Sequence, residues 1–451
     1  MNWSIIRTQV LVAGLFFALP VTAQQTLETY LKRGLDSNLA LRQQSFDLEK
    51  ARLDLRRAQS QFYPQANIAS QYTLAHGGRT QDIPIGDLLN NVYSTLNELT
   101  SSGKFPQVQN QNITFLPNDF HDTKLEVTMP VVNMNIRYNK QIKEEQIKTR
   151  QAGVEVYKRE LVKTIKQAYY QYLQADRSVA IYNNALSLVQ ENLRVSEKMV
   201  ANGTATKEAT LRAKAQVSQV QASAIEAANN RQNAAAYFNF LLNQPLETPV
   251  GTDSSIAEQF TNQLTVSTEV PAAREELAQL KSTQRVLNTS LKMNKSYLIP
   301  NLNAFYNIGF QGFGFRFNSD QFYQLGGLQL QWSLFRANDN KYKIQQSQLD
   351  LDAVANQYRE VEQQLTLQVR TAYNNYYSAI KSMQALADEV YSAQETYRLT
   401  ERRFREGQAL QLELIDIRSQ LTNAQIRYSL AQLAVLTRAA DVERATASYK
   451  F

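Results

Sequence analysis

Few residues of this chain have side chains that could carry out chemistry. Cysteine is absent, and the 451 residues include only two histidines, His76 and His121. No spacing typical of a metal site or an activated nucleophile occurs, so the sequence predicts no catalytic, cofactor or metal-binding residue and disfavours an exported hydrolase. Both histidines fall in a polar stretch punctuated by Gly and Pro, where we expect them to be solvated.

One pair of acidic residues follows a predicted glycine turn. Glu413 and Asp416 follow Gly407, and their spacing of three puts both carboxylates on one face of a helix. A solvated acidic face is the alternative interpretation. The net charge of +7 comes from Lys and Arg residues interspersed with acidic ones, which is typical of solvated helices and disfavours nucleic-acid binding.

Two long predicted helices precede the glycine turns, and the second of them leads to this acidic pair. Residues 161–200 and 365–404 share one heptad pattern, at the same offset that separates Gly203 from Gly407. A parallel seam of small residues permits close helix packing. Each half is therefore predicted to hold a long helix, a glycine turn and a returning helix, and the helix from about 137 to 201 would be roughly 100 Å long. The matching apolar positions are Ile165, Tyr172, Val179, Leu186, Leu193 and Val200, then Val369, Tyr376, Met383, Val390, Tyr397 and Phe404.

Ahead of each long helix the hydrophobic period changes to two. Four strands of about ten residues, each with one apolar and one polar face, are expected. Pro64 and Pro300 end the preceding helices and release the chain into extended conformation. An insertion at about 75–122 separates the first two strands, and it reads as a long polar loop with a short amphipathic helix through Leu88, Leu89, Val92, Leu96 and Leu99. The four strands are expected at about 65–75, 122–132, 301–312 and 322–335.

Local composition predicts where the two repeats begin and end. Residues 1–23 combine Arg7, an apolar run and a small-residue site, which predicts a secretory signal; a short anchor helix is the alternative. A polar link at 244–270 separates the first repeat, 24–243, from the second, 271–451. No later segment reaches about 18 consecutive apolar residues, so we expect no membrane-spanning helix.

The strands point to a channel shared between chains. A bilayer forbids open sheet edges, and bacterial barrels begin at about eight strands, so four strands require partners. If the apolar faces meet lipid, the polar faces line water. A soluble β-sandwich and a filamentous coiled coil are the alternatives, and the coiled coil explains neither the signal nor the strands.

The order of these elements resembles the TolC-like outer membrane efflux protein family. The similarity covers nearly all of the mature chain, and its motifs are Phe62-Tyr63-Pro64, Leu298-Ile299-Pro300, Met129-Pro130-Val131-Val132-Asn133, Trp332-Ser333-Leu334-Phe335-Arg336 and Arg274-Glu275-Glu276-Leu277. The resemblance implies a mainly α fold with β-strands: a homotrimer whose twelve strands form an outer membrane barrel, continued by a long periplasmic helical barrel.

The resemblance also assigns roles to residues. Glu413 and Asp416 would ring the periplasmic aperture, where three copies concentrate six carboxylates. The tip turns for adaptor docking would be Gly203-Thr204 and Gly407-Gln408, and Pro130, Asn133, Phe335 and Arg336 would mark the barrel-to-helix transition. Thr204 or Thr206 is expected to cap the next helix. Ala209, Arg212 and Ala409 depart from the family pattern, so we expect no arginine–acid lock between the halves.

The predicted function is therefore a passive exit duct in the outer membrane of a Gram-negative bacterium. Its expected partners are a periplasmic adaptor (membrane fusion) protein, an inner-membrane RND or ABC transporter and outer membrane lipid, with no cofactor, no nucleic acid and no enzymatic activity. A periplasmic adaptor-like coiled-coil protein is the alternative. Adaptors normally have one hairpin and a Gly-rich domain, whereas this chain has two predicted hairpins and few Gly residues.

Overall fold

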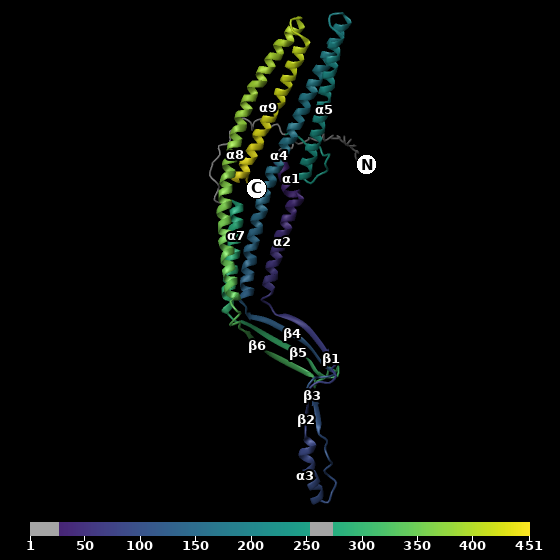
Figure 1. The fold of residues 1–451 in the computed structure, drawn as a ribbon, viewed down its shortest axis with the longest axis vertical. Helices are drawn as coiled ribbons and strands as arrows, with labels where there is room; N and C mark the ends of the chain where they lie inside the picture. Colours follow the sequence, from purple (N-terminus) through teal and green to yellow (C-terminus); the bar gives the residue numbers. More distant parts are fainter. Residues whose placement is uncertain (1–26, 253–273) are drawn as a thin grey trace, which may run out of the picture. The chain divides into compact units, whose positions relative to one another are not determined.

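The computed structural model describes residues 27–252 and 274–451, so the expected signal at 1–23 and most of the expected link lie outside the described residues. The chain divides into two compact units. We call them the helical unit (described residues up to 47, within 151–279 and from 358 onward) and the strand unit (48–150 and 280–357). Figure 1 traces the elements along the chain.

The elements occur in the same order twice. Helix, strand, strand, long helix and returning helix make up each repeat, which confirms the expected fold class of a mainly helical chain with strands. The first repeat holds α1 (Leu27–Ser37), α2 (Leu39–Ser60), β1 (Gln65–Thr73), β2 (Thr80–Ile83), α3 (Ile85–Leu99), β3 (Gln111–Thr114), β4 (Phe120–Val132), α4 (Met134–Ala201) and α5 (Lys207–Leu241). The second holds α7 (Glu275–Lys295), the 3-10 turn η1 (Ser296–Leu298), β5 (Asn301–Phe313), β6 (Phe322–Gln331), α8 (Asp339–Arg405) and α9 (Gln411–Thr446).

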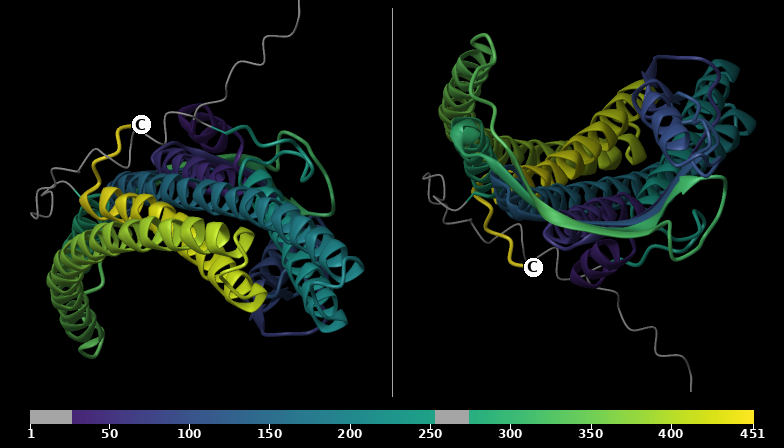
Figure 2. Two further views of the ribbon diagram at one scale, coloured as in Figure 1. Left: turned by 90° about the horizontal axis from the view of Figure 1, so that it is seen from above. Right: turned by 90° about the horizontal axis from the view of Figure 1, so that it is seen from below.

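The strand unit contains one four-stranded antiparallel sheet, in the order β1-β4-β5-β6, which curves strongly in the views of Figure 2. Register partners share a face of the sheet. Ile68, Leu125 and Ile308 are aligned on one face, while Asn67 and Glu126 are aligned on the other. The predicted alternation of apolar and polar faces therefore holds across three strands. Within this chain β1 and β6 form the two edges of the sheet.

The chain enters the sheet at the predicted prolines and leaves it through a helix cap. Pro64 directly precedes β1, and Pro300 directly precedes β5. The side-chain oxygen of Asn133 accepts hydrogen bonds from the backbone N–H groups of Asn135 (3.0 Å) and Ile136 (3.2 Å), so Asn133 caps α4.

The corresponding exit of the second repeat differs from the first. The fourth strand was expected to reach 335, but β6 ends at Gln331, and Ala337 and Asn338 have positive φ angles of 42° and 66°. These left-handed residues break the extended backbone before α8 begins. Phe335 is highly exposed, and Arg336 donates to the hydroxyl of Ser333 at 3.3 Å.

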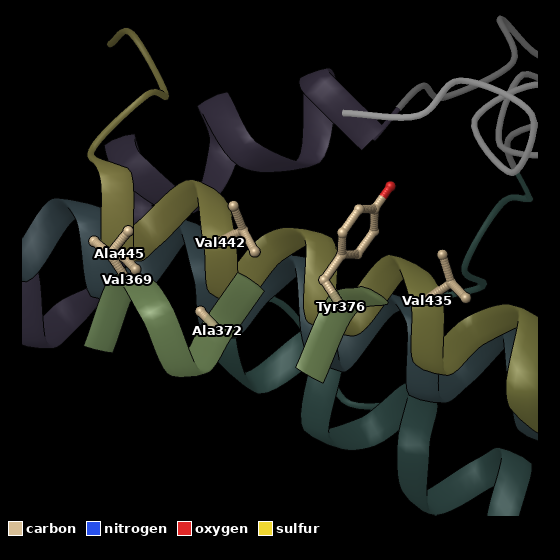
Figure 3. Packing of buried hydrophobic residues seen from close by; sticks show 6 residues of the cluster. All are labelled: Val369, Ala372, Tyr376, Val435, Val442 and Ala445. Carbon is tan, nitrogen blue, oxygen red and sulfur yellow. The ribbon is translucent and has the colours of Figure 1, made fainter. Parts of the chain in front are cut away.

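The helical unit is held together at the heptad positions. In the second repeat Val369, Ala372 and Tyr376 of α8 pack against residues of α9, namely Val435, Val442 and Ala445 (Figure 3). Ile165, Ala168 and Tyr172 of α4 are buried in the same way. None of the helices in the described ranges is long and apolar enough to cross a membrane.

A cluster of aromatic rings holds the chain that follows α5. Tyr30, Tyr169 and Phe238 come from α1, α4 and α5, are fully buried and contact one another at ring-centre distances of 5.0–5.6 Å. The Tyr169 hydroxyl donates to the carbonyl of Gly251 (2.9 Å), and the N–H of Gly251 donates to the Tyr30 hydroxyl (2.8 Å). The described start of the inter-repeat link is therefore fixed to this cluster.

The insertion is more structured than the sequence predicted. The expected short helix is present as α3, but β2 and β3 also pair as a separate antiparallel hairpin, which the polar composition had suggested to be loop. The missed strands are only four residues each, too short for a periodic signal.

Candidate functional site

The two hairpins of the helical unit end in identical turns. Gly203 and Gly407 both have φ of +74°, the left-handed conformation that favours glycine. The N–H of Thr204 donates to Met199 (2.9 Å) and that of Gln408 to Arg403 (2.7 Å), while each glycine N–H donates to the carbonyl three residues before it. This pair of bonds is the Schellman arrangement, which satisfies the free carbonyls at a helix end.

The predicted threonine cap at the first tip is wrong. Thr206 stands at the N-cap position of α5 but makes no side-chain capping bond. The hydroxyl of Thr204 instead donates backward to the carbonyl of Met199 at 2.9 Å. The hydroxyl of Thr204, which was expected to cap α5, therefore satisfies a free carbonyl at the end of α4. Glu208 lies in the first turn of α5 and pairs with Arg212 at 2.6 Å.

The acidic pair lies in the first two turns of α9, and Glu413 follows the second tip turn, Gly407-Gln408, by five positions. Glu413 accepts from Arg403 at 3.1 Å, and Asp416 accepts from Gln420 at 2.9 Å. Arg403 and Glu413 are both about half-exposed, so this ion pair contributes little to stability. Arg403 and Glu413 belong to the same hairpin, so this ion pair closes the second tip on itself.

A buried arginine that the sequence analysis missed ties the hairpins together. Arg418 of α9 donates to the carbonyl of Leu188 on α4 at 2.7 Å and to the hydroxyl of Tyr397 on α8. Its side chain is nearly buried, and its guanidinium lies 5.2 Å from the centre of the Tyr397 ring. The sequence feature that could have revealed this burial is the position of Arg418 one turn after Leu414, on the buried face of α9.

Further polar contacts join the same elements. The side chain of Gln411 donates to the hydroxyl of Ser196 on α4, and Gln216 of α5 donates to the hydroxyl of Ser419 at 3.5 Å. The start of α9 is thus bonded to both helices of the first hairpin. Because these bonds are polar and partly exposed, each is individually weak.

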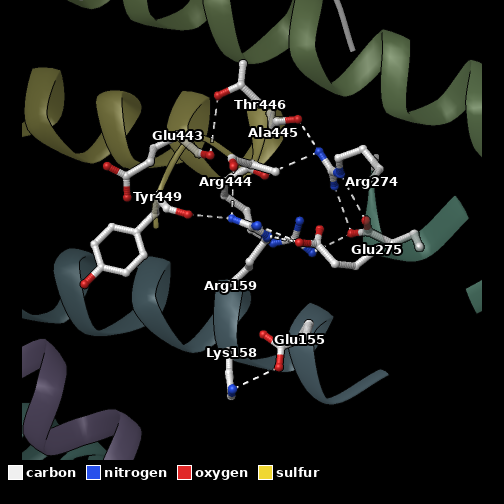
Figure 4. A network of polar contacts seen from close by, with 12 residues as sticks. Glu155, Lys158, Arg159, Arg274, Glu275, Glu443, Arg444, Ala445, Thr446 and Tyr449 are labelled. Atoms are coloured by element: carbon white, nitrogen blue, oxygen red, sulfur yellow. Dashed lines mark hydrogen bonds and ion pairs between the residues drawn. The ribbon is translucent and has the colours of Figure 1, made fainter. Parts of the chain in front are cut away.

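A second charged network surrounds the end of α9 (Figure 4). The completely buried Arg274 donates to the backbone carbonyl of Ala445 and forms an ion pair with Glu276 at 2.8 Å. Arg444 joins Glu276 (2.9 Å) and Glu160 (3.0 Å). The sequence motif at 274–277 therefore serves a structural purpose: its arginine occupies the free carbonyls at a helix C-terminus, where the helix dipole favours a cation.

Arg159 extends this network to the last residues of the chain. It pairs with Glu275 at 2.5 Å and donates to the carbonyls of Ala447 (3.0 Å) and Tyr449 (2.9 Å). Nearby, Lys166 of α4 pairs with Glu443 of α9 at 2.7 Å. These bonds fasten α4, α7 and α9 to one another.

The carboxyl of Glu276 is strongly perturbed. Burial is the largest single influence and acts to raise its pKa, because it disfavours the charged form. The hydrogen bond and charge of Arg274, a backbone N–H and the hydrogen bond from Arg444 together outweigh burial and lower the pKa of Glu276 to about 2. Glu276 is therefore ionised throughout the physiological range.

The polar face of the sheet carries a short row of charges. Lys124 lies between Asp122 (3.0 Å) and Glu126 (3.3 Å), and the hydroxyl of Tyr323 donates to Asp122 at 2.9 Å. These residues come from β4 and β6 and point to the side opposite Leu125. One face of the sheet is thus both polar and charged.

The prediction that both histidines are solvated is wrong for His121. Its ring is completely buried, its Nε2 lies 2.9 Å from the side-chain oxygen of Gln321, and the rings of Phe315 and Phe317 lie 5.2 Å from its centre. The loop between β5 and β6 covers this residue, which no local pattern could reveal. His76 is exposed. Within the described residues, no group of His, Asp and Glu could hold a metal ion.

Comparisons with known proteins agree with this architecture. Residues 252–448 match the family described as "Outer membrane efflux protein". The alkaline protease secretion protein AprF of Pseudomonas aeruginosa is 24% identical over 292 residues, which are 62% of this chain and 59% of that protein. The alignment therefore spans about three fifths of the relative's length.

Solved structures share the fold over almost the whole chain. The Campylobacter jejuni CmeC outer membrane channel superposes with a TM-score of 0.74 at 13% identity, covering 99% of this chain and 94% of that one. The outer membrane protein VceC of Vibrio cholerae gives 0.72 at 14% identity, covering 93% and 95%. At such low identity these similarities concern the fold alone.

Proposed function

We propose that this chain is the exit duct of a tripartite efflux or secretion system, because residues 252–448 match the outer membrane efflux protein family and the elements occur in the order described above. The sheet would span the outer membrane, and the helices would continue the passage into the periplasm. The duct conducts passively and catalyses nothing. An inner-membrane RND or ABC transporter supplies the driving force, and a periplasmic adaptor protein links the two.

The observation that carries this proposal is the two-faced, open-edged sheet. Its apolar face, with Ile68 and Leu125, suits lipid, and its polar face, with Asp122 and Lys124, suits water. Open edges at β1 and β6 are not tolerated in a bilayer. Three copies joined edge to edge would give twelve strands, which is enough for a closed barrel with an aqueous interior.

The tips of the hairpins are the proposed docking site for the adaptor. Gly203-Thr204 and Gly407-Gln408 form hydrogen-bonded turns there, and the second turn is followed by the exposed apolar side chains of Leu410 and Leu412. Exposed leucines beside polar turns suit a protein interface. Glu413 and Asp416 are the proposed aperture residues beside these tips.

The class of cargo is part of the proposal. The sequence relative is named for the secretion of an alkaline protease, and the matching family is named for efflux. A water-filled duct has no deep pocket that could select its cargo, so we assign selection to the inner-membrane transporter. The duct is proposed to accept both small molecules and unfolded polypeptides.

The test uses the full chain extracted from outer membranes. Native mass spectrometry in detergent should give a mass of three copies, and planar bilayers should register a stable, water-filled conductance. A monomer without conductance would refute the duct. The periplasmic adaptor-like protein would then remain as the alternative, although neither the fold nor the family match supports it.

A further inference from the structure

Helix α3 in the insertion is packed with its polar face inward. Four residues that contact the returning segment 105–110 recur at steps of four, three and four and so share one face: Gly86, Asn90, Tyr93 and Asn97. Asp87 and Ser94, which also bond to this segment, lie beside that face. Asparagines on the packed face and leucines elsewhere reverse the usual amphipathic orientation of a surface helix. Apolar side chains of α3 are therefore left on its other, outward face.

Paired hydrogen bonds fix the rotation of α3 about its axis. Asn90 donates to the carbonyl of Val108 (2.9 Å) and accepts from its N–H (2.7 Å). Asn97 does the same with Phe105, at 2.7 Å and 3.1 Å. At Gly86 a Cβ would lie only 2.4 Å from the carbonyl oxygen of Val108, so the helix approaches the segment as closely as glycine allows.

The opposite face is an exposed apolar seam. Leu88, Val92 and Leu99 are 69%, 52% and 78% exposed, and together with Thr95 they recur at the same steps of four, three and four. The hydroxyl of Thr95 already donates to the carbonyl of Asn91 within the helix. The only charged residues of α3, Asp87 and Glu98, lie beside the seam and not on it. This spacing is the one by which coiled-coil helices pack.

The length of the seam indicates what covers it. Helix α3 has 15 residues, and a coiled-coil contact of that length is too short to hold a freely diffusing partner. It suffices when the partner is tethered nearby, because tethering raises the effective concentration to about the millimolar range. The insertion continues directly from β1, an edge strand, and so emerges where neighbouring copies would join.

We propose that the α3 helices of three copies pack together through Leu88, Val92 and Leu99 as a three-helix bundle at the outer mouth of the duct. The inference rests on the trimeric duct proposed above. In that duct the insertion joins the strand ends opposite to those that continue into α2 and α4, which places it outside the cell. The bundle narrows or covers the external exit, and cargo leaves between its stalks or by parting them.

Single cysteines test the seam directly, because the chain has none of its own. Val92→Cys and Leu99→Cys are made in the full chain, oxidised in intact cells and compared with Ser94→Cys. Ser94 is an exposed residue of the same helix that lies off the seam. A threefold bundle links two of its three copies, so covalent dimers containing up to about two thirds of the chains are expected for the seam variants. None are expected for Ser94→Cys.

Native mass of the same samples separates the two proposals. Trimers without seam-specific dimers would overturn the bundle and leave the duct intact. Equal linking at Ser94, or disulfides that join two trimers into a hexamer, would also overturn the bundle. Monomers would overturn the duct itself.

Discussion

At the scale of single residues, buried charge distinguishes structure from function. Arg274 is completely buried, Glu276 is partly buried, and both are bound to several partners, so they hold helices together. Glu413 and Asp416 are more exposed and lightly bound, so their charges remain available to ions. The charged residues at 274–276 and the acidic pair at the tip therefore play different parts.

Removal of the acidic pair should change ion selectivity. Three copies of Glu413 and Asp416 near one axis would attract cations, so Glu413→Ala with Asp416→Ala should lower the ratio of cation to anion permeability in planar bilayers. The matched control removes two other acids, Glu191→Ala with Glu395→Ala, which are exposed on the long helices and pair with neighbouring arginines. An unchanged ratio in the tip variant would remove the aperture assignment.

Loss of the buried arginine should loosen the tip. Arg418→Met removes bonds to Leu188 and Tyr397, and we expect it to lower the free energy of unfolding by about 1–3 kcal/mol and to raise the resting conductance. Arg427→Met, which breaks an exposed pair with Glu389, should change neither quantity appreciably. Thermal unfolding followed by circular dichroism and single-channel recording measure the two effects. Equal effects of the two variants would contradict the role of Arg418.

The charge network predicts a specific acid sensitivity. Folding lowers the pKa of Glu276 from an unfolded value of about 4.3 to about 2, so its contribution is complete above pH 5 and is lost as the pH falls toward 2. That contribution is up to about 3 kcal/mol. Glu276→Gln should be less stable at pH 7 and show a flatter loss between pH 5 and 2, whereas Glu395→Gln, at an exposed position, should follow the wild type. Parallel pH profiles for Glu276→Gln and wild type would refute this.

At the scale of elements, glycine occurs in two different backbone settings, in the tip turns and within a long helix. Gly407 adopts a positive φ in a turn, with open space around the position of a Cβ. Gly153 lies within α4 in ordinary helical conformation, and its nearest neighbour to an added Cβ is a side-chain nitrogen at 3.7 Å. The first glycine is required by backbone geometry, and the second is not.

Alanine substitutions should therefore have opposite signs at these two positions. Gly407→Ala should destabilise by about 1–2 kcal/mol, because an L-residue is strained in the left-handed region. Gly153→Ala should stabilise by about 0.5–1 kcal/mol, because alanine loses less backbone entropy in a helix. Unfolding midpoints measured side by side decide the matter, and a stabilising Gly407→Ala would contradict the turn geometry.

At the scale of the whole molecule, the unpaired edges of the sheet imply assembly. If β1 of one copy pairs with β6 of the next, cysteines placed on both edges should join the copies. Combinations of Asn67→Cys or Ala69→Cys with Tyr323→Cys or Leu325→Cys, which lie on one face of the sheet, should produce covalent trimers in at least one case. Asn67→Cys alone should give none. Exclusively monomeric bands across all combinations would contradict closure by edge pairing.

The sequence by itself determined the features that occur in both repeats and depend on local geometry. The heptads that bury Ile165 and Val369, the prolines that precede β1 and β5, and the glycines at both tips act through local geometry, so their spacing alone reveals them. The doubled order of elements followed from these local rules, and that order carried the resemblance to the outer membrane efflux protein family.

Only the tertiary structure decided what depends on distant neighbours. His121 is buried because a loop 200 positions away covers it, Arg418 bridges to Leu188 on another hairpin, and Thr204 bonds backward and leaves α5 uncapped. The outward turn of the α3 seam is fixed by asparagines that bind the backbone of a returning segment. Such contacts join residues far apart in the chain, and periodicity carries no information about which of them meet.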